Sequence, residues 1–97
     1  MTSRRSGAML DTGSESLSYD GQKIELTKNE YRILACLLEN KGKVVSRERL
    51  MERLWETDAF VDENTLTVNV ARLRKKLDAA GLAAFITTKF GVGYMIQ

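Results

Sequence analysis

The chain has 97 residues and a mass of 10.9 kDa, the size of a single small domain. Hydrophobic residues make up 43% of it and charged residues 29%, a balance typical of a globular domain and unlike that of a disordered or membrane-embedded chain. The absence of histidine and the presence of only one cysteine, Cys36, exclude His-based catalysis, His-ligated or multi-Cys metal sites and an internal disulfide. We therefore expect a binding domain without metal or cofactor rather than an enzyme.

Positive charge is concentrated in the C-terminal third of the chain. Residues 1–63 contain ten Lys and Arg against twelve Asp and Glu, whereas residues 64–97 contain five against one. This asymmetry favours a surface that faces a polyanion such as nucleic acid. The alternative is a basic helix face that is simply solvated.

The sequence carries no signal for export or membrane insertion. No apolar run approaches the roughly 18–20 residues of a membrane span, and no signal-peptide pattern follows the start. We therefore expect a soluble, cytoplasmic protein. Residues 1–7 are polar and basic, and we assign them to a flexible tail or linker remnant and residues 8–97 to one folded domain.

The domain is predicted to begin with a small antiparallel sheet. Ala8–Leu10 is a candidate short strand. Leu17–Tyr19 and Lys23–Leu26 alternate apolar and polar residues on either side of Asp20-Gly21. An Asp-Gly pair between alternating segments is a strong hairpin signal, so we expect these segments to pair.

Two helices are predicted next, each with a capping signal at its start. Thr27 and Glu30 form a capping box, and Gly42 suits the left-handed position after the end of the first helix. Val44-Val45 predicts a very short strand, and Ser46 can cap the second helix. The apolar residues at helical spacing are Tyr31, Ile33, Leu34, Ala35, Leu37 and Leu38, then Leu50, Met51, Leu54 and Trp55.

A third helix and a second hairpin complete the chain. After an acidic loop over Glu56–Glu63, the apolar spacing predicts a helix over Asn64–Leu77. Phe85–Gln97 alternates in part around Gly91-Val92-Gly93, which predicts two strands joined by a glycine turn. The order is therefore sheet, three helices and hairpin. The buried stripe expected on the third helix consists of Leu66, Val70, Leu73 and Leu77.

The third helix also carries the side chains of a base-reading surface, with no acidic residue over Asn64–Lys76. In a major groove, arginine can contact guanine, asparagine can contact adenine, and a valine methyl can meet the thymine methyl. The alternative is that Val68 packs against a loop and the arginines are solvated. The charge asymmetry and the hairpin that follows favour DNA. The residues assigned to this face are Thr65, Val68, Asn69, Arg72 and Lys76.

Several segments resemble one bacterial family. Asn64–Leu77 (NTLTVNVARLRKKL) followed by Gly91-Val92-Gly93-Tyr94 is similar to the OmpR/PhoB-type winged-helix effector domain of response regulators. Leu26–Tyr31, Val45–Glu48 and Leu54-Trp55 fit the same family in order and spacing, so the resemblance extends from about residue 17 to the end. It implies an α+β fold, a winged helix-turn-helix with a short N-terminal antiparallel sheet, three helices and a C-terminal β-hairpin wing.

The resemblance implies sequence-specific binding of double-stranded DNA in transcriptional regulation. The third helix lies in the major groove, and the wing contacts the adjacent minor groove or its phosphates. Members bind direct repeats as head-to-tail dimers, so we expect a monomer that pairs on DNA, and some members also contact RNA polymerase. A sensor kinase acts through a receiver domain that this sequence does not include. The alternative function is a winged-helix protein-interaction module.

Site residues follow from the resemblance, position by position. The base contacts are Val68, Asn69 and Arg72, and the wing turn consists of Phe90, Gly91 and Gly93. The acidic loop residues that match a polymerase-contacting segment are Glu56, Asp58, Asp62 and Glu63. The DNA backbone contacts are Arg47, Trp55, Asn64, Thr65, Arg74, Lys76, Thr88, Lys89 and Tyr94.

Three positions carry further expectations. Trp55 is expected to have a packed ring and a free indole N–H. Ala71 stands where many relatives have Asn or Arg, so that one contact is missing. Phe90 stands where some members place a minor-groove arginine, and we expect Lys89 to hold phosphate in its place.

Overall fold

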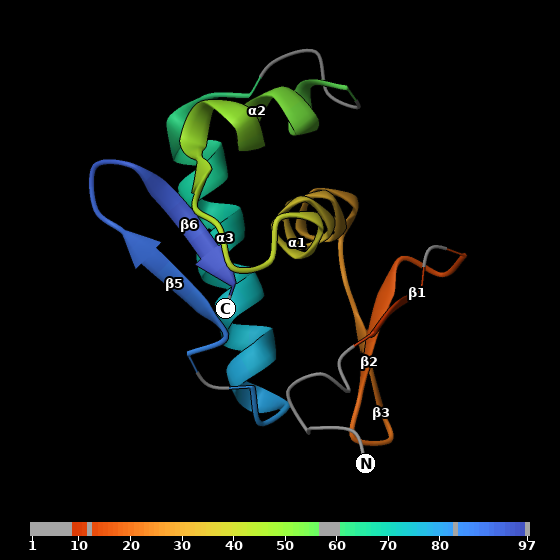
Figure 1. Ribbon diagram of the computed structural model, residues 1–97. Coiled ribbons are helices and arrows are strands. Elements are labelled where there is room, and N and C mark those ends of the chain that lie inside the picture. The colour runs from red at the N-terminus through yellow and green to blue at the C-terminus, as the bar shows by residue number, and fades with distance from the viewer. Residues whose placement is uncertain (1–8, 12, 57–60, 83, 97) are drawn as a thin grey trace.

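The computed structural model describes residues 9–11, 13–56, 61–82 and 84–96 (Figure 1). Within them, three helices lie between an N-terminal sheet, on the right of the view, and a C-terminal hairpin, on the left. This order confirms the predicted α+β arrangement. The predicted tail, residues 1–7, lies outside the described residues.

The N-terminal sheet contains β1 (Met9–Asp11), β2 (Ser16–Tyr19) and β3 (Gln22–Glu25), which pair antiparallel in that order. The predicted Asp-Gly hairpin is confirmed, because Tyr19 pairs with Gln22 and only two residues connect the strands. Both turn residues have positive φ, 52° at Asp20 and 78° at Gly21, as a type I′ turn requires.

The first two helices begin where their capping residues predict. α1 (Lys28–Glu39) starts with the full capping box: the Glu30 N–H donates to Thr27 Oγ1 at 3.2 Å, and the Thr27 N–H donates to Glu30 Oε1 at 2.9 Å. α2 (Arg47–Trp55) starts at Ser46, whose hydroxyl accepts from the Arg49 N–H at 3.1 Å.

The third helix is longer than its apolar spacing predicts. α3 spans Glu63–Ala79, so it begins one residue earlier than the predicted Asn64 and ends two residues later than Leu77. The reason for the early start is Asp62, whose carboxylate accepts from the Thr65 N–H at 2.8 Å and caps the helix. The predicted apolar stripe is confirmed, since all four of its side chains are buried: Leu66, Val70, Leu73 and Leu77.

The C-terminal hairpin belongs to a second three-stranded sheet. β5 (Ile86–Lys89) and β6 (Gly93–Ile96) pair antiparallel, and β4 (Val45–Ser46) pairs with the other side of β6. The expectation that Gly93 is a turn residue is wrong: it lies in β6, where a Cβ atom would be 1.9 Å from the Val45 carbonyl oxygen. Only glycine allows this approach between β4 and β6.

The helices enclose one hydrophobic core that both sheets cover. Leu17 of β2 and Ile96 of β6 are fully buried against it from opposite ends of the chain. Cys36, in α1, is also buried. In the described part of the chain, no helix is long and apolar enough to cross a membrane.

Candidate nucleic-acid interface

The face of α3 opposite its buried stripe points to solvent. Val68 is 38% exposed there, and Arg72 and Lys75 are also exposed. Among the described residues, neither of these two cations has a hydrogen-bond or ion-pair partner. We call this exposed surface the outward face of α3. It consists of Asn64, Thr67, Val68, Ala71, Arg72 and Lys75.

This face is rotated relative to the predicted one. Three residues assigned to it, Thr65, Asn69 and Lys76, lie roughly a quarter turn away, on the edge of α3 that faces α1. Thr65 is half-buried, and its hydroxyl donates to Asp62 Oδ1 at 2.9 Å. The prediction missed Thr67 and Lys75, which could have been found by centring the polar face opposite the leucine stripe.

The prediction that Asn69 lies on the exposed face is wrong. The residue is 8% exposed, and its Nδ2 donates to the Thr65 carbonyl oxygen at 2.8 Å, one helical turn earlier. Asn69 and Arg72 border a shallow hollow whose other wall is the start of α1, residues 27–29. Arg72 is therefore exposed to solvent beside this hollow, whereas the side-chain amide of Asn69 is buried and bonded to the backbone of α3.

Lys76 is held by the protein rather than free for phosphate, contrary to the prediction. Its Nζ lies 2.6 Å from Glu30 Oε1 and donates to the Glu25 carbonyl oxygen at 3.0 Å. The Glu30 side chain is only 1% exposed, so Lys76 supplies the positive charge beside a buried carboxylate. This contact connects the C-terminal half of α3 to the start of α1.

Arg74 points to the hairpin, not to solvent. Its guanidinium donates to the Ile86 carbonyl oxygen at 3.2 Å and to the Thr88 hydroxyl, and it lies 5.8 Å from the centre of the Tyr94 ring. Three residues predicted to contact DNA phosphates are thus in contact with one another, and Tyr94 is buried. The arrangement fixes the hairpin against α3.

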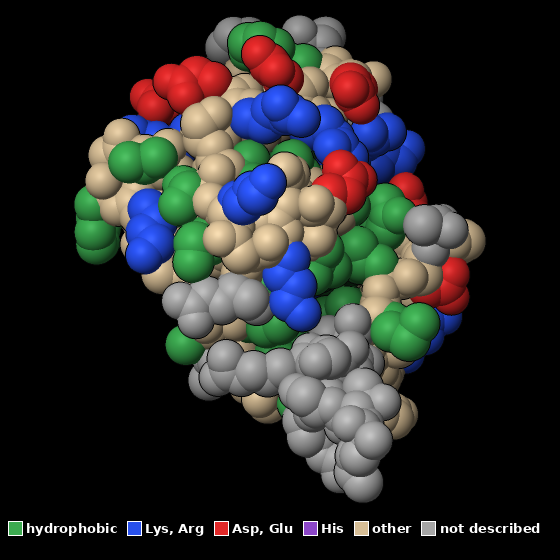
Figure 2. All heavy atoms as spheres, viewed as in Figure 1, with side chains coloured by type: hydrophobic (Ala, Val, Ile, Leu, Met, Phe, Trp, Pro, Cys, Tyr) green, Lys and Arg blue, Asp and Glu red, His purple; other side chains and the backbone are tan. Residues whose placement is uncertain are grey.

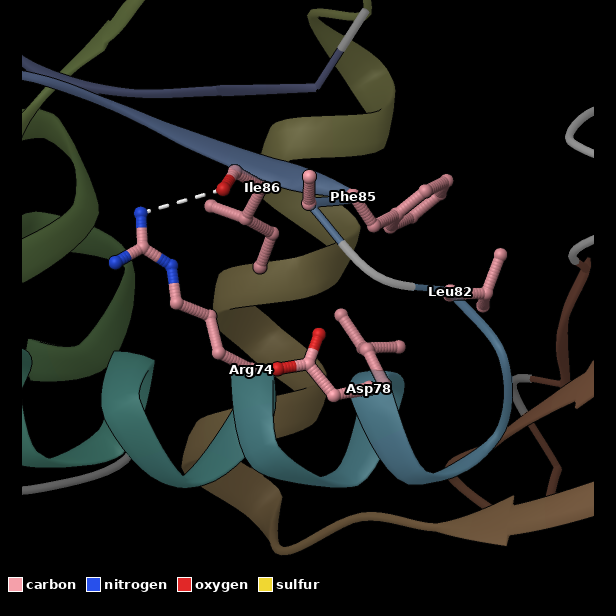
Figure 3. A pocket seen from close by; sticks show the side chains of 7 residues that line it. Arg74, Asp78, Leu82, Phe85 and Ile86 are labelled. Atoms are coloured by element: carbon pink, nitrogen blue, oxygen red, sulfur yellow. Dashed lines mark hydrogen bonds between the residues drawn. The ribbon is translucent and has the colours of Figure 1, made fainter.

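A small hollow lies beside this contact. Figure 3 shows Arg74 extending from α3 to the Ile86 carbonyl, with Asp78 one turn later on the same helix and Phe85 turned away from both. Leu82 closes the far end. The hollow separates the end of α3 from the segment that leads to β5.

Trp55 differs from its prediction in both respects. The residue is 52% exposed rather than packed, and the indole N–H donates to the Val61 carbonyl oxygen at 3.0 Å rather than being free. This bond connects the end of α2 to the segment before α3. Because the donor is already used, Trp55 is a poor candidate for holding phosphate in this arrangement.

Of the acidic residues predicted to form a loop, one lies in α3, and the described ones form ion pairs or cap a helix. Glu63 is in the first turn of α3, 3.8 Å from Arg47 Nε, and Asp62 caps the helix. Glu56 pairs with Arg32 at 3.2 Å. Asp58 lies outside the described residues.

We expect Asp62→Ala to destabilise the folded domain in a pH-dependent way. Hydrogen bonds from the Thr65 N–H and hydroxyl hold the pKa of Asp62 below its ordinary value of 3.8. The stabilisation is therefore fully present above that value and is lost as the pH falls through the lower folded-state pKa. Urea unfolding of wild type and variant should differ near neutral pH and converge at strongly acidic pH. Asp62→Asn retains the cap and should remove this pH dependence. A difference in free energy of unfolding between wild type and Asp62→Ala that stays constant with pH would contradict capping by the Asp62 carboxylate.

At the hairpin, two basic residues lie side by side; Lys89 has no ion-pair partner among the described residues, and Arg47 pairs with Glu63 at 3.8 Å. Lys89 is exposed at the end of β5, and Arg47 lies beside it in a groove along the β5–β6 turn, the 89–92 segment. The Val92 N–H donates to the Lys89 carbonyl oxygen at 2.9 Å, and Gly91 has the positive φ (77°) that its place in this turn requires. The outward face of α3 carries Arg72 and Lys75, and the neighbouring turn carries Lys89. None of these three cations has an ion-pair partner among the described residues.

Comparison with known proteins identifies the family. Residues 21–96 match the family model described as "Transcriptional regulatory protein, C terminal". The chain belongs to this family. Its description is that of a regulator rather than of an enzyme, and the fold is the winged helix that the resemblance predicted.

Two curated relatives are named as a sensory transduction protein and a response regulator protein. The chain is 55% identical over 91 residues to the sensory transduction protein BceR of Bacillus subtilis (strain 168), covering 94% of this chain and 39% of BceR. It is 47% identical over 88 residues to the response regulator protein GraR of Staphylococcus aureus (strain MRSA252), covering 91% and 39%. The chain thus spans about two fifths of the length of these relatives.

Two solved structures share the fold over almost their whole length. The C-terminal domain of the nisin resistance regulator NsrR matches with a TM-score of 0.83 and 44% identity, covering 94% of this chain and 91% of that one. The DNA-binding domain of the response regulator AdeR, solved in complex with an intercistronic region, matches with a TM-score of 0.81 and 28% identity, covering 94% and 93%.

Proposed function

We propose that the domain binds double-stranded DNA sequence-specifically and thereby regulates transcription. α3 enters the major groove, and the 89–92 turn contacts the adjacent minor groove or its phosphates. The observation that carries this proposal is the outward face of α3, which exposes Val68, Arg72 and Lys75 and has no acidic residue between Asn64 and Lys76. Family membership and the likeness to the AdeR domain, whose structure contains DNA, support it.

The residues divide into two roles in this proposal. Arg72 and Val68 read base edges, because they are exposed at the middle of the helix. Lys75, Arg47, Lys89 and the side chains of Asn64 and Thr67 contact the DNA backbone from the ends of this surface. Arg74, Thr88 and Tyr94 act through the position of the hairpin, and Lys76 through the stability of the fold.

Two measurements test the proposal. Bound sequences are first selected from a random duplex pool, and the selected and scrambled duplexes are then titrated at several salt concentrations. We expect strong discrimination and an affinity that falls linearly on a log–log plot, with a slope of about −0.9 for each phosphate contacted. A preference of less than about tenfold for any sequence would instead favour a protein-interaction module, since specific sites usually exceed non-specific DNA by about a thousandfold or more.

We further propose that the domain is the effector part of a cytoplasmic response regulator. The response-regulator relatives, of which the chain spans about two fifths, support a receiver domain that a sensor kinase phosphorylates. The domain binds direct repeats as a head-to-tail dimer and is a monomer without DNA. Sedimentation with duplexes that contain one or two half-sites tests this, because only the two-site duplex should carry two domains.

Contact with RNA polymerase is a separate part of the proposal. Acidic side chains lie over α2 at the top of Figure 2. Glu56 follows the end of α2 and Glu63 is the first residue of α3. Each is exposed and pairs with one arginine. Glu56→Lys should lower transcription in a reconstituted assay while leaving DNA affinity unchanged within about twofold; an equal loss of both would place its effect on DNA binding.

A further inference from the structure

One large apolar side chain projects from the hairpin into solvent. Phe90, in the 89–92 turn, is 92% exposed, which is more than any other large hydrophobic residue of the described chain. Figure 2 shows hydrophobic side chains at the left edge of the molecule, over the β5–β6 turn, with basic side chains near them. An aromatic ring left in water contributes nothing to the core, so folding does not explain its presence there.

The turn that carries Phe90 is fixed relative to α3. On one side the Arg74 guanidinium holds β5 through Ile86 and Thr88. On the other, β6 pairs with β4, and the Arg47 N–H donates to the Val92 carbonyl oxygen at 3.3 Å. A side chain at this tip is therefore presented at a set distance from the outward face of α3, which allows both to engage one ligand.

The charges around the ring identify the ligand. Lys89 and Arg47 border the same groove as Phe90, and the described residues lining this groove include no acidic side chain. Lys89 is unpaired among the described residues, and Arg47, although it pairs with Glu63, is 40% exposed. An apolar tip beside these two cations matches a surface that has negative charge on both sides of an apolar slot. The minor groove of duplex DNA has this form, with phosphates along both walls and base-pair edges between them.

We propose that Phe90 inserts into the minor groove as an apolar wedge, partly unstacking a base-pair step and bending the duplex beside the site that α3 reads. This inference rests on the proposed DNA binding and adds the mode of contact at the hairpin. Phenylalanine is among the side chains that proteins insert between base steps in this way. Pyrimidine–purine steps are the easiest to unstack, so Phe90 adds a preference for TA or CA/TG at a step that α3 does not contact.

The wedge and a cationic contact differ in their dependence on salt. Phe90→Ala should weaken binding to the selected duplex by about 5- to 20-fold, reduce its bend measured by energy transfer between end labels, and leave the salt slope unchanged. Lys89→Ala should reduce the salt slope by about 1 and leave the bend unchanged. Met9→Ala removes another exposed apolar side chain, on the N-terminal sheet, and should bind as wild type does.

A series of duplexes, with each step beside the selected site changed in turn to TA or to GC, locates the wedge. At one step, wild type should bind the TA duplex about fivefold or more tightly than the GC duplex, and Phe90→Ala should bind the two equally. Equal affinity, equal bending or an equal step preference of wild type and Phe90→Ala would overturn the inference and leave the proposed DNA binding intact. Wild type that prefers no sequence would overturn both. Because the ring is exposed, Phe90→Ala should unfold at the wild-type temperature, which confirms that the comparison is between folded proteins.

Discussion

Replacing Lys76 with alanine is expected to lower the free energy of unfolding by about 2–3 kcal/mol, because it removes the cation beside a buried carboxylate. Glu30 is 1% exposed, and its Oε1 accepts from both Lys76 Nζ, at 2.6 Å, and the Thr27 N–H. Without the ammonium group the carboxylate keeps its capping bond but has no opposite charge within contact distance. The partial exposure of Lys76 places the expected loss below the 3–5 kcal/mol typical of a fully buried pair.

Lys75 provides a matched control for this prediction. It is the neighbouring lysine, lies on the outward face of α3, and has no partner among the described side chains. Lys75→Ala should change stability by less than about 0.5 kcal/mol, as expected for a surface residue, and should weaken DNA binding equally for all sequences. Urea unfolding of the two variants measures the difference. Equal stability of Lys76→Ala and Lys75→Ala would mean that the contact with Glu30 does not support the fold.

A double variant separates charge pairing from packing. Glu30→Gln combined with Lys76→Ala removes both charges without restoring the lysine side chain, so it should recover part of the stability that Lys76→Ala loses. Failure to recover any of it would assign the loss to the aliphatic part of the lysine side chain instead.

Replacing Arg72 with alanine is expected to weaken binding to the selected duplex by about 1–3 kcal/mol and to relax the preference at one base pair. Arg72 is the exposed arginine of α3 without a partner in the described part of the chain, so its guanidinium is free to make a bidentate contact with a guanine. The loss on scrambled duplexes should be much smaller, because they offer no matching base. Competition titrations with every single-base change of the site measure both effects.

Lys41 supplies the control for charge. It is exposed and lies just after α1, at the opposite end of that helix from the hollow beside Arg72. Lys41→Ala removes the same charge and should leave discrimination between sequences unchanged. If Arg72→Ala also keeps full discrimination, Arg72 contacts the backbone and another residue reads the bases.

Sequence patterns predicted the features that depend on local hydrogen bonds and on periodic burial. The Thr27–Glu30 capping box and the Asp20-Gly21 turn form within a few residues, so their chemistry is complete in the sequence itself. The apolar stripe of α3 extends over about three turns, and it predicts the buried side even though the ends of the helix differ by one or two residues. Asp62 marks the true start of α3 and was available as a capping signal.

The directions of long polar side chains near the edges of α3 depended on the tertiary structure. Lys76 and Arg74 lie two residues apart, but one reaches Glu30 on α1 and the other reaches Ile86 on β5. Their flexible chains can reach either solvent or protein, and the choice is made by partners far away in the sequence. Asn69 is at the border between the buried and exposed sides, where the packing of α1 against α3 determines its exposure.

The sequence by itself determined the order of the elements, the buried stripe and the basic character of the third helix, because propensity, capping and periodicity act over neighbouring residues. Only the tertiary structure decided which of the cations remain free for a ligand. It did so because a buried carboxylate or carbonyl oxygen needs a donor, and the nearest lysine or arginine in space supplies it. Arg72 and Lys75 have no such acceptor within the described residues and remain available, whereas Lys76 and Arg74 hold the fold together.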